Sequence, residues 1–152
     1  IKGASAIISC LGQEYSRGDS SNKVSKGNKN IIEAAKSVGV LRFVNIASID
    51  YAYVKDDNSS KRIKYARLFS KYVFPNAYNE FNQISNDTAN SGLNWTTVRF
   101  IRPSDEPSRG RVITSYGEIP FVASVSREDI AMFSVCALSS NEFVNDMPMI
   151  GY

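Results

Sequence analysis

Residues 93–99 are Leu-Asn-Trp-Thr-Thr-Val-Arg, and residues 100–107 continue directly as Phe-Ile-Arg-Pro-Ser-Asp-Glu-Pro. The first stretch is rich in the β-branched and aromatic residues that favour strands, and the second is a polar loop stiffened by proline. Residues 6–12 and 43–48 have the same form, an apolar run that breaks into small polar residues. Open α/β sheets bind ligands where their parallel strands end. We therefore expect these strands to point their ends at one crevice.

Helical patterns connect these strands. The first begins at residues 27–30, keeps a helical period of apolar residues up to Val38, and ends at Gly39, where a positive φ causes no Cβ clash. The second pattern covers residues 78–91 and ends before Gly92. Because each helix lies between two strands, the chain predicts two β-helix-β units, and short connections of this kind favour parallel strands.

The remaining segments predict smaller elements. Residues 49–77 show no clear period, which indicates a loop combined with a short helix. Ser126 is a suitable N-cap for a helix whose body is 130–138, and the acids that follow it favour the positive end of the helix dipole. Short strands are expected at residues 111–114 and 121–123 and, at a sheet edge where proline is tolerated, at 147–150.

Composition is typical of a soluble globular domain, and the predicted elements together indicate one α/β layer structure. It has 152 residues, of which 43% are hydrophobic and 22% charged, and a net charge of +3. The densest basic cluster, residues 61–67, has no sustained stripe, so a solvated loop or helix face is expected there rather than a nucleic-acid or membrane surface. No run approaches the roughly 20 apolar residues of a membrane span. Two cysteines without paired spacing indicate a reducing compartment, so a cytoplasmic location is expected.

The cysteine and histidine contents exclude several chemistries. Cys10 and Cys136 lack the paired spacing of a metal site or a redox dithiol, so both are expected to be reduced, buried small hydrophobes. The chain contains no histidine, which excludes imidazole bases, Ser-His triads and histidine-ligated metals within it. No metal site is predicted.

Three motifs in order carry a family resemblance: residues 27–44, 91–99 and 125–131. They resemble the atypical short-chain dehydrogenases/reductases, and most of all the NAD(P)H-binding, NmrA-like group that includes biliverdin reductase B and bacterial NADH-flavin reductases. The resemblance spans nearly the whole chain. It implies the C-terminal portion of a Rossmann-like parallel sheet with helices on both faces, and NADP or NAD as the cofactor.

The resemblance also reveals a difference. Members of the group begin with a strand and a glycine-rich turn that grips the cofactor pyrophosphate, and no such glycine pattern stands in residues 1–152. We therefore expect residues 1–152 to be a single NAD(P)-binding domain that is truncated at its N-terminus. The strand over residues 6–10 would then be an exposed edge, which a homodimer partner or the missing N-terminal half should cover.

Cofactor-binding residues follow from the resemblance, at the ends of the three strands. Ser48, near the nicotinamide, is also the candidate catalytic residue, since its hydroxyl could donate a hydrogen bond to cofactor or substrate. The predicted binding residues are Cys10, Leu11 and Gly12 on the adenosine side, Ala47 and Ser48 near the nicotinamide, and Phe100, Ile101 and Arg102 in a loop that closes over it.

Each of these assignments has a structural alternative. Gly12 could simply end a strand, and Ser48 could cap one. Arg102 could contact a pyrophosphate or an anionic substrate, or could be an exposed arginine paired with Asp105. Residues 126–129 are expected to be a helix cap with an ion pair rather than a catalytic motif.

The acceptor class follows from a missing pair of residues. Ordinary short-chain dehydrogenases place a Tyr and a Lys four residues apart, so that the Lys lowers the Tyr pKa for proton transfer. Tyr51 and Lys55 have this spacing, but they follow Ser48 too closely and are interpreted as coincidence. Hydride transfer to a flavin, quinone or similar conjugated acceptor is therefore expected. The alternatives are a non-catalytic nicotinamide redox sensor that binds a protein partner, and an inactive half-fold.

Overall fold

The computed structural model describes residues 1–12, 22–51, 53–56, 60–117, 122 and 124–152. Its main sheet has five strands, and every pairing is parallel except the one between β5 and β7. Two further short strands, β4 (Pro103–Ser104) and β6 (Val125–Ser126), pair with each other. In spatial order the main sheet is β1 (Ala6–Ser9), β2 (Arg42–Ser48), β3 (Asn94–Phe100), β7 (Met149–Gly151) and β5 (Ile113–Ser115).

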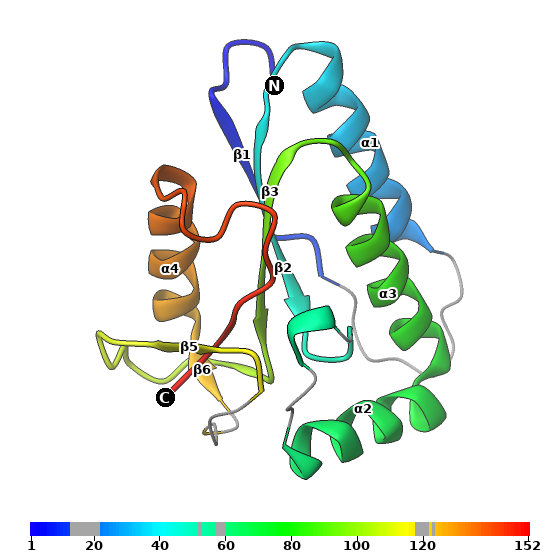
Figure 1. Cartoon of the computed structure of the whole chain (residues 1–152), viewed down its shortest axis with the longest axis vertical. Helices are drawn as coiled ribbons and strands as arrows, with labels where there is room; N and C mark the ends of the chain where they lie inside the picture. The colour runs from blue at the N-terminus through cyan, green and yellow to red at the C-terminus, as the bar shows by residue number, and fades with distance from the viewer. Residues whose placement is uncertain (13–21, 52, 57–59, 118–121, 123) are drawn as a thin grey trace.

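Helices lie on both faces of this sheet (Figure 1). One face is covered by α1 (Lys23–Ser37) and α3 (Pro75–Ala89), and the other by α4 (Arg127–Ser139). The 3₁₀ turn η1 (Val54–Asp56) and helix α2 (Lys61–Val73) lie beyond the carboxyl ends of the central strands. The predicted fold class is confirmed, because the sheet is mostly parallel and is layered between helices.

The alternating side chains of β2 and β3 build two cores. On one face Phe43, Trp95 and Leu93 pack with Ile32 and Ala35 of α1. On the other face Val44, Val98, Phe100 and Val125 pack with Ile130 and Ala137 of α4. Burying each large apolar side chain contributes roughly 1.5–3 kcal/mol, so the central strands are the best anchored part of the sheet.

One of the predicted helix ends is wrong, and two are confirmed. Helix α1 begins at Lys23, four residues before the predicted start, so Gly27 lies inside the helix. A Cβ at Gly27 would meet the Leu11 side chain at 3.2 Å. The glycine therefore gives close packing rather than a break. Gly39 has φ 75°, as a helix stop requires. Ser126 caps α4, accepting a hydrogen bond from the Asp129 N–H at 3.0 Å.

The predicted edge strand at 147–150 is wrong in position. Strand β7 lies between β3 and β5, and β5 forms that edge instead. Proline has no N–H to donate, but Pro148 takes part in the pairing through its carbonyl, which accepts the Arg99 N–H at 2.9 Å. The strand candidate 121–123 lies outside the described residues except for Val122.

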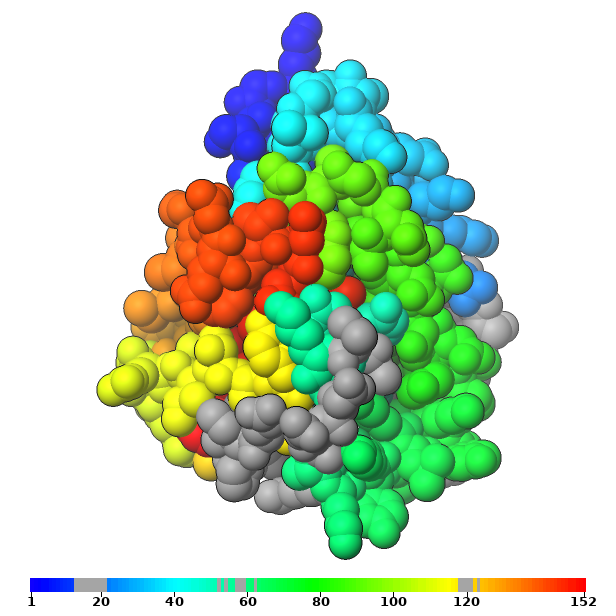
Figure 2. Space-filling model, viewed as in Figure 1, coloured from blue at the N-terminus to red at the C-terminus, as the bar shows by residue number. Residues whose placement is uncertain are grey.

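Helix α2 carries the whole basic cluster and forms one end of the molecule, opposite the N-terminal residues (Figure 2). Lys61 and Lys64 are exposed there, so the predicted solvated helix face is confirmed for them. Arg67 differs, because it folds back to form an ion pair with Asp56 at 2.6 Å. Among the described residues, no helix combines the length and apolar character needed to cross a membrane.

Candidate functional site

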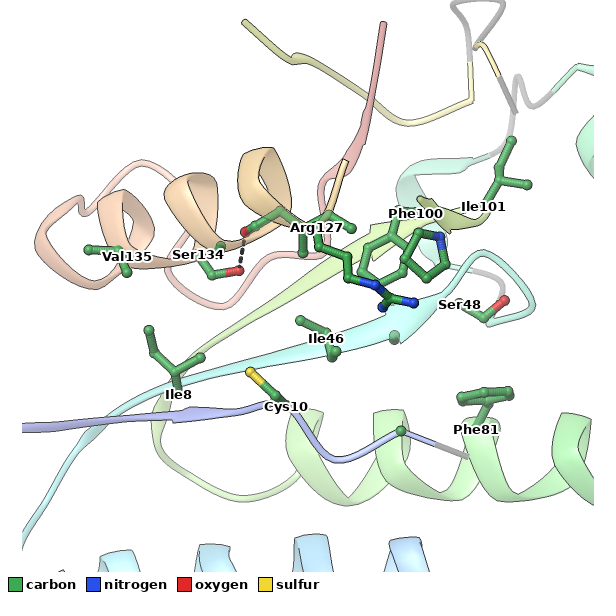
Figure 3. A pocket seen from close by; sticks show the side chains of 15 residues that line it. Ile8, Cys10, Ile46, Ser48, Phe81, Phe100, Ile101, Arg127, Ser134 and Val135 are labelled. Atoms are coloured by element: carbon green, nitrogen blue, oxygen red, sulfur yellow. Dashed lines mark hydrogen bonds between the residues drawn. The ribbon is translucent and has the colours of Figure 1, made fainter. Parts of the chain in front are cut away.

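A cavity of about 710 Å³ opens at the carboxyl ends of β1, β2 and β3 (Figure 3). One wall comes from the ends of β2 and β3, and the opposite wall from the pocket-facing side of α4. Phe81 of α3 and the segment after β1 complete the lining. The lining residues are Ile8, Cys10, Gly12, Ile46, Ala47, Ser48, Phe81, Phe100, Ile101, Pro103, Arg127, Ile130, Ala131, Ser134 and Val135.

The three predicted strand ends therefore meet at one pocket. Of the predicted binding residues, those that line it are Cys10, Gly12, Ala47, Ser48, Phe100 and Ile101. Leu11 does not line the pocket and lies against Gly27 of α1. Arg102 is also outside the lining and exposed; its backbone carbonyl accepts the Val125 N–H at 2.9 Å and so joins β4 to β6.

Arg127 is the functional candidate that the sequence interpretation missed. Its side chain reaches into the pocket from the start of α4 (Figure 3). Its Nε donates to Asp105 at 2.8 Å, so the partner expected for Arg102 belongs to Arg127. No local pattern reveals this, because the contact depends on the β4–β6 pairing that brings residue 105 beside α4.

Ser48 is held by a carboxylate next to the pocket. Its Oγ donates to Asp50 Oδ2 at 3.0 Å and accepts the Asp50 N–H at 3.3 Å. Asp50 is buried. These bonds orient the hydroxyl at the end of β2 and use its single proton, so Ser48 would accept a hydrogen bond from a ligand rather than donate one as expected.

Asp129 fixes the α4 wall of the pocket from behind. Its carboxylate accepts hydrogen bonds from the hydroxyls of Ser108, Ser126 and Tyr152 and from the Arg109 N–H. Burial by itself would raise the pKa of Asp129, but these donors hold the pKa well below its usual range. The loop before β5, the start of α4 and the last residue of the chain are therefore tied to one anion.

The opposite side of β3 is occupied by charged side chains. Arg99 is fully buried and binds Asp56 through two bonds, of 2.6 and 2.9 Å. Arg67 adds a third bond to Asp56 at 2.6 Å. Burial opposes ionisation of Asp56, but hydrogen bonds and charge from Arg99 keep its pKa lowered. The site is a satisfied ionic network.

A second polar group extends this network around Asp146. The carboxylate of Asp146 accepts bonds of 2.6 Å from both Lys55 and the Tyr116 hydroxyl. Burial and Asp146 together raise the pKa of Tyr53 to about 12 and also raise the pKa of Tyr116. Because Tyr51 instead bonds Asn86 at 3.2 Å, Tyr51 and Lys55 have different partners, in agreement with the interpretation of their spacing as coincidence.

The prediction of buried cysteines is wrong. Cys10 and Cys136 are both free and exposed. Cys10 follows the last residue of β1, where the chain leaves the sheet and lines the pocket. Cys136 lies off the buried stripe of α4, which Ile130, Ser134 and Ala137 form. A short, mostly apolar helix does not show which of its faces is buried, so the pattern was insufficient. No metal-binding cluster of His, Cys, Asp or Glu occurs among the described residues.

The chain belongs to the NAD(P)H-binding family, whose model matches residues 1–141. This confirms the predicted cofactor class, NAD or NADP. No curated protein matches the chain.

Similar solved structures share the fold at low sequence identity. The oxidoreductase ylbE of Lactococcus lactis is 17% identical with a TM-score of 0.71, covering 99% of this chain and 63% of that protein. A short-chain dehydrogenase/reductase of Veillonella parvula in complex with NADP is 16% identical (TM-score 0.68, 99% and 64%). ChuY, an anaerobillin reductase of Escherichia coli O157:H7, is 18% identical (TM-score 0.64, 95% and 62%). The chain thus spans less than two thirds of each of these proteins.

The lining of the pocket is compatible with a flat, largely apolar ligand group such as the ring of a nicotinamide cofactor. Its walls are largely aliphatic and aromatic, which suits a flat ring. A Cβ placed on Gly12 would meet no atom of the described residues within 4 Å. Among the described lining residues, Arg127 alone is charged. A ligand phosphate in this pocket would therefore meet one cation among the described lining residues.

Proposed function

We propose that this chain carries the nicotinamide- and acceptor-binding part of an NAD(P)H-dependent oxidoreductase of the NmrA-like group, with a flavin, quinone or similar conjugated molecule as its acceptor. The observation that carries the proposal is the apolar cavity at the ends of three parallel strands, in a member of the NAD(P)H-binding family. We place this activity in the cytoplasm, as the composition predicts.

The lining residues suit orientation more than acid-base chemistry. A bound nicotinamide cofactor would supply the hydride. Phe100, Ile46 and Ile130 would exclude water and hold two flat rings together, while Ser48, oriented by Asp50, would bond a polar edge of a ring. The described lining contains no Tyr or Lys. A conjugated acceptor suits this site, because it can take its proton from solvent, whereas a ketone needs a placed donor.

The test is a titration of the 152-residue chain with NADPH, followed by nicotinamide fluorescence, with a flavin or quinone added at the end. The proposal expects saturable binding and then acceptor-dependent oxidation of NADPH. Binding without oxidation would reject the reductase and favour the redox sensor. No saturable binding would contradict both functions for this chain.

Ala131 and Met132 provide a matched pair of variants on α4. Ala131 lines the pocket, whereas Met132 is 53% exposed and lies outside the lining. Ala131→Phe would fill the cavity and is expected to weaken NADPH binding by about tenfold or more, since roughly 1.4 kcal/mol corresponds to a factor of ten. Met132→Phe should leave binding within twofold. Equal effects of the two variants would place the ligand elsewhere.

A further inference from the structure

The pocket contains a single charged side chain among its described lining residues, and it is Arg127. The remaining lining is aliphatic, aromatic or small and polar. The Ser134 hydroxyl is used within α4, since it donates to the Ile130 carbonyl at 2.7 Å. A ligand that fills the cavity therefore meets apolar walls and one guanidinium.

The present partner of Arg127 is easily exchanged. Asp105 contacts Nε at 2.8 Å, with side-chain exposures of 63% for Arg127 and 87% for Asp105. An ion pair this exposed typically contributes no more than about 1 kcal/mol. The contact uses one of the five N–H donors of a guanidinium, whose planar fork matches a carboxylate or phosphate. The contact with Asp105 shows that Arg127 can bind a carboxylate, and the weakness of this exposed pair means that another anion can replace Asp105.

We infer that Arg127 binds a phosphate or carboxylate carried by the acceptor, so that the acceptor class is an anionic molecule with a flat conjugated ring system. The ring lies against Phe100 and Ile46, and the anion replaces Asp105 at the guanidinium. The guanidinium lies at the exposed rim of the cavity, so the anion can reach it from solvent while the ring enters the apolar interior. The inference rests on the proposed function, because it assigns the anion to the acceptor of the reaction proposed above.

The test compares two flavins that differ by one phosphate. Flavin mononucleotide and riboflavin are titrated into the chain without NADPH, and binding is followed by quenching of flavin fluorescence. Wild type should bind the mononucleotide more tightly. Arg127→Gln should weaken mononucleotide binding about tenfold, the size of a charge-assisted hydrogen bond, and change riboflavin binding less than twofold. Arg127→Lys should recover part of the loss.

Two further variants serve as controls. Arg111→Gln removes the same charge from an exposed residue outside the pocket and should change neither flavin. Asp105→Asn removes the competing carboxylate and should tighten mononucleotide binding about threefold.

Several results would overturn the inference. Equal losses for both flavins in Arg127→Gln would mean that the arginine acts through shape. An unchanged mononucleotide affinity, with a loss for NADPH instead, would assign Arg127 to the cofactor. Because flavin binding is measured without NADPH, failure of hydride transfer with phosphate-dependent binding intact would reject the proposed function and leave the anion site standing.

Discussion

Arg99 and Phe100 are neighbours on β3, yet they serve opposite sides of the sheet. Arg99 is fully buried and holds Asp56 through two short bonds. Phe100 lines an open cavity whose walls are mostly apolar. One side of the strand end is filled by charges that satisfy one another, while the other side borders a mostly apolar cavity.

The difference shows how a sheet end can combine stability with binding. A buried charge is tolerated only when its partners are complete, so the Arg99 side has little freedom to change. The pocket side needs space, and its polar anchors lie behind the wall, at Asp129, rather than inside the cavity. Substitutions on the two sides should therefore affect different properties.

The largest expected effect is on the ionic side. Asp56→Asn leaves Arg99 buried without a countercharge and should lower the free energy of unfolding by about 3–5 kcal/mol. Urea unfolding followed by the fluorescence of Trp95 measures this. Asp105→Asn, which removes a carboxylate from an exposed pair, should change stability by less than about 1 kcal/mol. Similar losses in both variants would remove the contrast between the two sides.

An intermediate effect is expected at the pocket wall. Asp129→Asn weakens four hydrogen bonds to a carboxylate and should cost about 2 kcal/mol at neutral pH. The folded pKa of Asp129 lies below its ordinary value of 3.8, so its stabilisation is complete above that pH and is lost as pH falls below it.

Urea unfolding measured from pH 7 to pH 3 tests this direction of pH dependence. The difference in the free energy of unfolding between wild type and Asp129→Asn should become smaller once the pH falls below about 4. Glu128→Gln, an exposed neighbour on the same turn, is the control and should show no such gap. A gap that stays constant across the range would show that the charge of Asp129 does not contribute.

The smallest effect is expected at Tyr53. Its pKa is raised to about 12, so the stability it contributes is present below pH 10 and declines as pH rises toward 12. A near-ultraviolet titration should show tyrosines that titrate near pH 12 or later, Tyr53 and Tyr116, and Tyr53→Phe should reduce the size of this late component. Tyr65→Phe, at an exposed position of α2, should leave it unchanged. A late component of undiminished size in Tyr53→Phe would show that Tyr53 does not have the raised pKa.

Local signals were enough to predict the main strands and where they end. The β-branched runs at β2 and β3, the stop at Gly39 and the cap at Ser126 depend on neighbouring residues only, and the structure has them as expected. Boundaries failed where packing overrides propensity, as at Gly27, which fits inside α1 because Leu11 lies against it. The prediction that Cys136 is buried failed for a related reason, since its exposure depends on which face of α4 meets the sheet.

The sequence by itself determined the α/β class, the parallel order of the main units and the strand ends that form the pocket, because periodicity and turn chemistry act over a few residues. Tertiary structure alone decided that β7 lies inside the sheet and that Arg127 rather than Arg102 enters the pocket. It also decided that Arg99, Asp56 and Arg67 meet. These outcomes join residues far apart in the chain, and no local pattern records which distant charge will neutralise a buried one.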